Sequence, residues 1–139
     1  MSAFSKISQA LINQYRASGA FTDALTAYEN AAFTKPAASV PWGAVFIITN
    51  QPTPESAGAG GMDGNTGFLQ IDLNYPINAG AGAIVAKADS VAQYFKAGTR
   101  LAYSWQQVQI QSCGRSQGRL VDGFYRVSMT INWTAYVPR

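Results

Sequence analysis

Residues 122–137 read DGFYRVSMTINWTAYV, and in this stretch apolar and polar side chains alternate with a period of two. The apolar positions are Tyr125, Val127, Met129, Ile131, Trp133, Ala135 and Val137, and the polar positions are Arg126, Ser128, Thr130, Asn132 and Thr134. Successive side chains of a β-strand point to opposite faces, so the pattern predicts one strand with a single buried face. A strand of this length exceeds the usual range, and we expect it to organise the sheet.

Three other stretches are predicted to be strands. Residues 42–49 include an unbroken apolar run, which is typical of a central strand buried on both faces. Residues 67–75 alternate, with inward Leu69, Ile71, Leu73 and Tyr75 and outward Gln70, Asp72 and Asn74. Residues 99–113 change phase near Gln106, which predicts a bulge or a break there. A short strand is expected near residues 25–29.

Two stretches carry the spacing of amphipathic helices. The first is capped by Ser2 and stopped by Gly19, with an apolar face of Phe4, Ile7, Leu11, Ile12 and Tyr15. The second spans residues 83–96, with an apolar face of Ile84, Ala88, Val91, Ala92 and Phe95. We therefore predict a single α+β domain over residues 1–139, in which a mostly antiparallel sheet of four to six strands packs with two helices.

The composition points to contacts with other molecules. Hydrophobic residues make up 47% of the 139 residues and charged residues only 12%, about half the usual charged share. Either the surface carries uncharged polar residues, or copies of the chain and its partners cover much of it. The net charge of +3 and the scattered cations predict no nucleic-acid stripe. We expect no membrane segment or signal peptide, and synthesis in the cytoplasm.

Motifs for catalysis or cofactor binding are missing. The chain has no histidine, and its seven acidic residues show no recognisable catalytic pairing. The glycine-rich stretch SAGAGGMDGNT, residues 56–66, lacks the lysine of a phosphate-binding loop and precedes a strand. Cys113 is a lone cysteine with no activating neighbour in sequence. We therefore predict no catalytic residue, no cofactor and no metal site.

Several segments resemble one known family. Residues 27–36 read AYENAAFTKP, residues 41–47 PWGAVFI, and residues 67–72 GFLQID, followed by the helix at 88–95 and DGFYRV at 122–127. Their order and spacing resemble the tail terminator family of long-tailed bacteriophages, over essentially the whole chain. Tyr28 stands where some members have Trp, and residues 36–40 are unusually rich in alanine.

The resemblance implies a structural part of the virion tail, at its head-proximal end and assembled in the host cytoplasm. Its members form a six-fold ring that caps the tail tube, stops polymerisation and offers a surface to the head-side connector or neck protein. Genome DNA would pass through the ring without sequence-specific contacts. The signature residues, read as structural, are Tyr28, Glu29, Asn30, Phe33 and Pro36. Other interpretations are a neck or head–tail joining protein, a small α+β ligand-binding domain, and a nucleic-acid-binding module.

Two loops are candidate assembly surfaces. We expect residues 56–66 to be disordered in the free protein and to contact the tube or a neighbouring subunit. The residues concerned are Ser56, Gly58, Gly60, Gly61, Met62, Asp63, Gly64 and Asn65. Arg115 and Arg119 flank the other loop, residues 114–118, and are expected at an exposed hairpin tip that contacts a partner.

Overall fold

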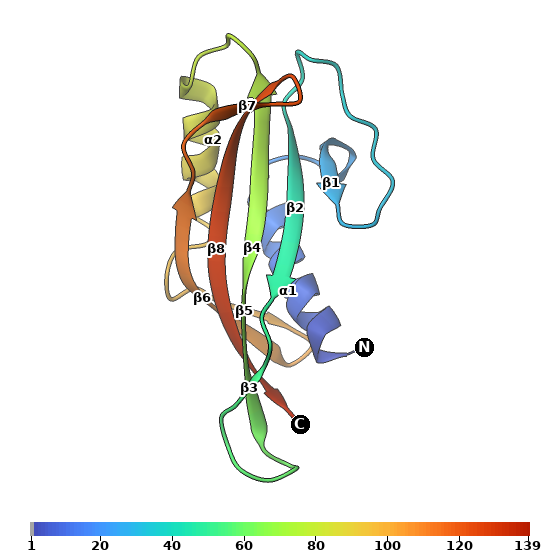
Figure 1. The fold of residues 1–139 in the computed structure, drawn as a ribbon, viewed down its shortest axis with the longest axis vertical. Coiled ribbons are helices and arrows are strands. Elements are labelled where there is room, and N and C mark those ends of the chain that lie inside the picture. The colour runs from blue at the N-terminus through green and yellow to red at the C-terminus, as the bar shows by residue number, and fades with distance from the viewer. Residues whose placement is uncertain (1) are drawn as a thin grey trace.

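Two long antiparallel strands form the centre of the sheet in the computed structural model, which describes residues 2–139 (Figure 1). Strands β4 (Met62–Pro76) and β8 (Phe124–Pro138) each contain 15 residues. They pair over their whole length without a register shift. The inward side chains of β8, from Val127 to Ala135, are buried, which confirms the long strand predicted from its period of two.

Within the described residues the sheet has eight strands, more than the four to six predicted. The other strands are β1 (Thr26–Tyr28), β2 (Trp42–Thr49), β3 (Thr53–Pro54), β5 (Arg100–Tyr103), β6 (Gln106–Arg115) and β7 (Arg119–Val121). The main order is β1-β2-β4-β8-β6-β5, with β3 added to β4 and β7 added to β8. Among these strands only β1 and β2 pair in parallel, so the sheet is mostly antiparallel, as expected.

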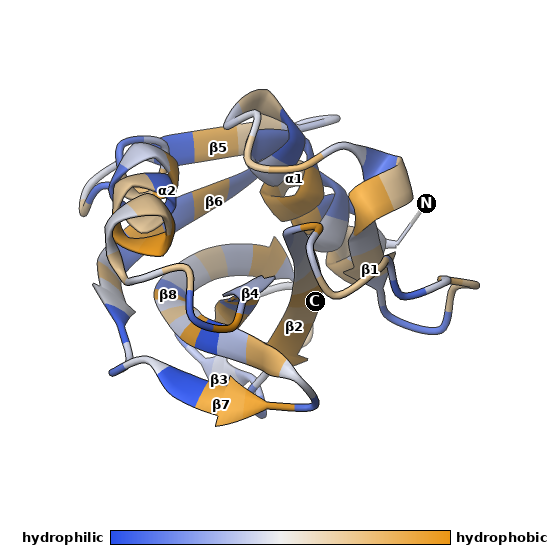
Figure 2. Ribbon diagram, turned by 90° about the horizontal axis from the view of Figure 1, so that it is seen from above, coloured by the Kyte–Doolittle hydropathy of each residue, from blue (hydrophilic) through white to orange (hydrophobic). Residues whose placement is uncertain are grey.

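The two helices bury most of their predicted apolar faces in one core, but Phe4 of the first helix is 45% exposed and lies outside it. Helix α1 (Ala3–Ala17) begins where the Ser2 hydroxyl accepts a hydrogen bond from the Ser5 backbone N–H, and it is followed by Gly19 at a φ of +67°. Helix α2 (Gly82–Ala92) ends four residues before the predicted Lys96. Both helices lie along the inner side of the curled sheet (Figure 2). A 3₁₀-helix, η1 (Asp23–Leu25), leads from α1 into β1.

A second, smaller apolar cluster covers one end of the outer face of the sheet. Trp42, Ala44 and Phe124 are buried there, and the connection between β1 and β2 contributes Phe33. The rings of Phe33 and Trp42 are 5.2 Å apart. Tyr28 packs on the other face, against Tyr15 of α1 at 6.3 Å. Phe33 and Tyr28 therefore act as packing anchors.

The prediction that β2 is buried on both faces is wrong for its second half. Phe46 and Ile48 are each 37% exposed on the outer face, whereas Val45 is buried on the inner one. The reason is that β1 pairs only with Gly43–Val45 of β2, and the outer cluster ends at Ala44. Beyond Val45 one edge of β2 has no strand beside it among the described residues.

The predicted outward residues Asp72 and Asn74 lie on the outer face, yet both are buried. The Asp72 carboxylate accepts a hydrogen bond from the Ser128 hydroxyl at 2.6 Å, and the Arg126 guanidinium donates to the Asn74 side-chain oxygen at 2.7 Å. Buried polar groups require such partners, so this network satisfies both side chains. The alternation of residues 67–75 therefore gave the correct faces and the wrong exposure for two polar residues.

Strands β5 and β6 form a hairpin, so the predicted break near Gln106 is confirmed. The turn is Ser104–Trp105, and both residues have positive φ, +47° and +75°. Such angles at both positions are typical of a two-residue type I′ turn. Trp105 is consequently 97% exposed at the tip.

Candidate functional site

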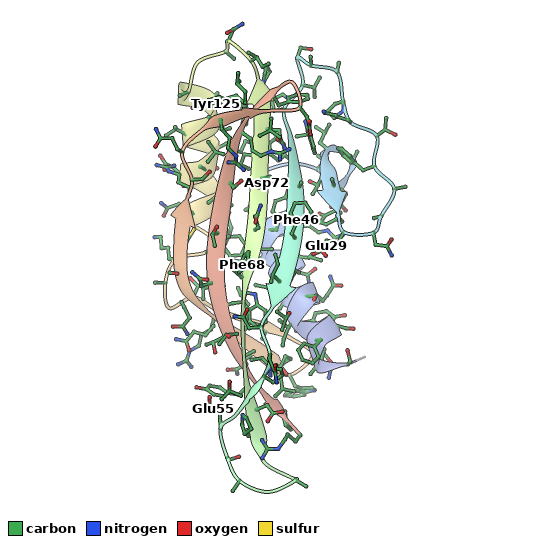
Figure 3. All side chains as sticks on the ribbon, viewed as in Figure 1. Glu29, Phe46, Glu55, Phe68, Asp72 and Tyr125 are labelled. Carbon is green, nitrogen blue, oxygen red and sulfur yellow. The ribbon has the colours of Figure 1, made fainter. Side chains whose placement is uncertain are left out.

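The signature segment ends β1 and controls the edge of β2. The Tyr28 hydroxyl donates a hydrogen bond to Asp23 at 2.7 Å, and Asn30 turns the chain away with a φ of +50°. Glu29 lies between them, and its carboxylate accepts a hydrogen bond from the Ile47 backbone N–H at 2.6 Å. The side chain of Glu29 thus takes the place of the next strand residue (Figure 3).

A groove runs beside this edge of β2. Its volume is about 320 Å³, and it is lined by Ser8, Ile12, Tyr28, Glu29, Val45, Ile47 and Thr49. The floor is apolar and comes from α1 and β2, and among these lining residues Glu29 carries a charge. The groove therefore suits an apolar group that also carries a hydrogen-bond donor or a positive charge.

The predicted loop at residues 56–66 is in part a strand, which corrects that expectation. Residues 62–66 belong to β4 and pair with β8, and only residues 55–61 form the turn after β3. Residues 51–60 are all exposed, and this tip projects beyond the rest of the sheet (Figure 1). The candidate residues Ser56, Gly58, Gly60 and Gly61 lie at the tip, and Met62, Asp63, Gly64 and Asn65 in the strand.

Arg139 holds the tip in place, which the sequence did not reveal. Its guanidinium donates hydrogen bonds to the carbonyls of Ser56, Gly58 and Met62 and pairs with the Asp63 carboxylate at 2.5 Å. A Cβ on Gly61 would clash with this guanidinium, so the contact requires glycine there. The signal was absent because the two segments are 76 to 83 residues apart along the chain.

The other groove at this end of the molecule lies beside the β5–β6 hairpin. Its volume is about 430 Å³, and Met62, Arg100, Trp105 and Tyr136 are among the residues that line it. Trp105 and Tyr136 are 97% and 57% exposed. Large exposed aromatic side chains mark interaction sites.

A third apolar surface lies on the outer face of the sheet. It is made by Phe46 and Ile48 of β2 and by the half-buried Phe68 of β4, which is paired with Ile48 (Figure 3). Trp42 and Phe33 stop short of this position.

Arg115 and Arg119 are not at a hairpin tip, contrary to the prediction. The tip is Asp122–Gly123, between β7 and β8, where both residues have positive φ. Arg115 lies in β6 and pairs with Asp89 of α2 at 2.7 Å. Arg119 donates a hydrogen bond to the Ser128 hydroxyl at 3.0 Å. Both arginines are nevertheless exposed, so contacts with a partner stay a prediction.

The remaining candidate for chemistry, Cys113, is half-buried. Burial raises the pKa of the Cys113 thiol, which keeps it in the less reactive protonated form. Within residues 2–139, no three side chains of His, Cys, Asp or Glu gather into a potential metal site. No helix in this part of the chain has the length and apolar character needed to cross a membrane.

The chain was compared with known proteins. The family model described as phage tail terminator protein matches residues 6–133. One solved structure aligns with a TM-score of 0.73 over 93% of this chain and 92% of that chain. Its sequence identity of 20% shows a shared fold alone. No curated protein matches the chain significantly.

Proposed function

Because this chain belongs to the phage tail terminator family, we propose that it forms a ring, a hexamer by family analogy, that caps the tail tube. Membership makes it a structural component of a virion tail that interacts with other tail and head proteins. The finer proposal is that the ring stops tube polymerisation at the head-proximal end and then provides the surface for the head-side connector or neck protein. Assembly would take place in the host cytoplasm, with genome DNA passing through the lumen.

The observation that carries the proposal is the projecting tip between β3 and β4. Ten consecutive exposed residues, 51–60, extend from the sheet, and Arg139 donates hydrogen bonds to the Ser56 and Gly58 carbonyls among them. A preformed projection loses less conformational entropy on docking than a disordered loop does. We assign this tip to the contact with the tail tube.

The opposite end of the sheet supports a second contact. Arg115 and Arg119 lie there with α2 and β7, and both residues are exposed. One end would thus face the tube and the other the connector. Tube subunits add to the exposed end of the tube. A ring with two different ends covers that end and presents a different surface outward, so no further tube subunit can add.

The test is to add purified protein to growing tail tubes and measure tube length by electron microscopy. Wild-type protein is expected to give capped tubes of limited length, whereas a variant lacking residues 57–60 should leave tubes uncapped. A variant lacking Ala38 and Ser39, in another exposed connection, is the matched control and should cap normally. Normal tubes that merely fail to join heads, when the protein is withheld during infection, would instead identify a head–tail joining protein.

A further inference from the structure

On the exposed edge of β2, a side chain occupies one backbone donor. The Glu29 carboxylate accepts a hydrogen bond from the Ile47 N–H. Because the backbone groups of a strand alternate in direction, those of Thr49, two residues further on, point to the same edge. The Glu29 side chain itself is exposed and, among the described residues, has no ion-pair partner. An incoming strand needs to displace only one carboxylate to pair with this edge.

A second open edge lies at the other end of the same sheet. β5 is the last strand, and within residues 2–139 it pairs with β6 alone. In a hairpin with a two-residue turn, Tyr103 and Gln106 bond to each other, so the backbone groups of Arg100 and Ala102 point outward. Arg100 is exposed and also lacks an ion-pair partner within residues 2–139.

The tip of this hairpin is strained in a way that presents an aromatic side chain. Trp105 has a φ of +75°, an angle that is unfavourable for bulky residues, and its side chain is 97% exposed. Strained residues that persist at exposed positions point to a function. Tryptophan is also the residue type most enriched among those that dominate binding energy at interfaces.

From these observations we infer that β5 of one copy adds to the edge of β2 in a second copy, with Trp105 in the groove beside Glu29. Arg100 neutralises the Glu29 carboxylate that the incoming strand releases from Ile47. The groove offers apolar contacts from the half-buried Ile12 and Ile47, and the polar Ser8 and Thr49 lie close enough to accept from the indole N–H. Charge complementarity identifies a second copy of the chain as the occupant, because the groove carries the unpaired Glu29 and the hairpin carries the unpaired Arg100.

The contact uses two different surfaces of the same chain. Such heterologous contacts repeat from copy to copy and close into a ring when the rotation permits. The inference therefore rests on the proposed ring and names the surface that joins its subunits. It also gives Glu29 a second role: while a copy is alone, the carboxylate protects an edge that would otherwise attract strands.

The experiment is a charge exchange. Glu29→Arg and Arg100→Glu are each expected to weaken self-association at least about tenfold, measured by sedimentation velocity, and the double variant should restore it. Trp105→Ala should weaken it similarly without touching the core. The matched control is Leu120→Ala, at an exposed position of β7, which pairs with β8 and lies at neither edge, and this variant should associate normally.

The outcomes separate this interface from the proposed function. If wild-type rings cap tubes while Trp105→Ala and both charge variants assemble normally, or if the double variant is not restored, the interface is wrong and the capping function stands. If wild-type protein stays monomeric even on tail tubes, both are wrong. Circular dichroism and thermal unfolding identify any variant that has not folded, and Trp105→Ala, at an exposed turn, then decides the question.

Discussion

Gly67 of β4 lies directly opposite Trp133 of β8, and this pair sets how closely the sheet can pack. A Cβ on Gly67 would lie 2.7 Å from the indole Cζ2 and would also clash with the Ile48 carbonyl. The indole is 1% exposed, so it has no space into which it can move. The position therefore excludes every side chain.

Gly67→Ala should lower the free energy of unfolding by roughly 1–3 kcal/mol, the usual cost of overpacking. Urea denaturation measures the change. Gly60→Ala is the control, because a Cβ there meets nothing within 4 Å. Equal stability of the two variants would contradict the close approach of Trp133.

The pH dependence of stability should be governed at high pH by Tyr15. Burial raises the pKa of this phenol to about 12, from an ordinary value near 10, and the hydroxyl is 2.8 Å from that of Thr26. As the pH rises above about 10, the unfolded chain loses the proton first, so the free energy of unfolding falls between pH 10 and 12. The contribution is complete below pH 10.

Tyr15→Phe should reduce this loss, since the variant lacks one of the groups that titrate. It should also be less stable at pH 8 by about 1 kcal/mol, because the Thr26 hydroxyl, which donates to the Thr22 carbonyl, loses the second of its two hydrogen bonds. Unfolding by urea at several pH values tests both statements. Tyr28, whose pKa burial also raises to about 12, still contributes in the variant, so some decline above pH 10 should remain.

Arg139→Ala should loosen the tip between β3 and β4 while leaving the core intact. The backbone amides of Glu55 and Met62 are bonded within this tip, to the Met62 carbonyl and to the Ser56 hydroxyl. Their hydrogen exchange should therefore become faster, with little change in the melting temperature. Arg16→Ala, which removes an exposed ion pair with Asp23, serves as the control. Unchanged exchange at Met62 would show that Arg139 does not order the tip.

Trp105→Gly should stabilise the fold and impair assembly at once. Glycine adopts positive φ without strain, so the free energy of unfolding should rise by roughly 0.5–1 kcal/mol. If the same variant loses stability, the turn is not strained. The opposite signs of the two effects would distinguish a side chain selected for contact from one selected for folding.

Charge reversal of Arg115 and Arg119 tests the end of the molecule that carries α2 and β7. Tubes should still be capped, but the fraction of tails joined to heads should fall several-fold. Because Arg115 pairs with Asp89, thermal unfolding of the variant has to be compared with that of Arg16→Glu, which breaks a similar exposed pair. Normal attachment would remove both arginines from the contact.

Local periodicity predicted most of this fold. The faces of β4 and β8 followed from alternation, and the ends of α1 from Ser2 and Gly19. Strand β7 was not predicted, because its three residues are too few to show a period of two. The alternation extends the predicted last strand back to Asp122, whereas Asp122–Gly123, a dipeptide typical of hairpin turns, forms the turn between β7 and β8.

The candidate surfaces were less predictable, since they depend on which distant segments meet. The burial of Asp72 requires Ser128, and the fixed tip requires Arg139. Nothing in the sequence around Glu29 indicates that its carboxylate reaches Ile47, 18 residues away. Alternation assigns a side chain to a face, but the neighbours that cover that face come from elsewhere in the chain.

The unbroken pairing of β4 with β8 has a mechanical consequence. Hydrogen bonds of an antiparallel pair run across the strands, so a pull along the strands loads all 15 residue pairs together, whereas a pull across them opens the pairs one by one. The domain should be stiff in the first direction and yield readily in the second. Single-molecule pulling would measure the difference in rupture force, with one pair of attachment points placed to pull along the two strands and a second pair placed to pull across them.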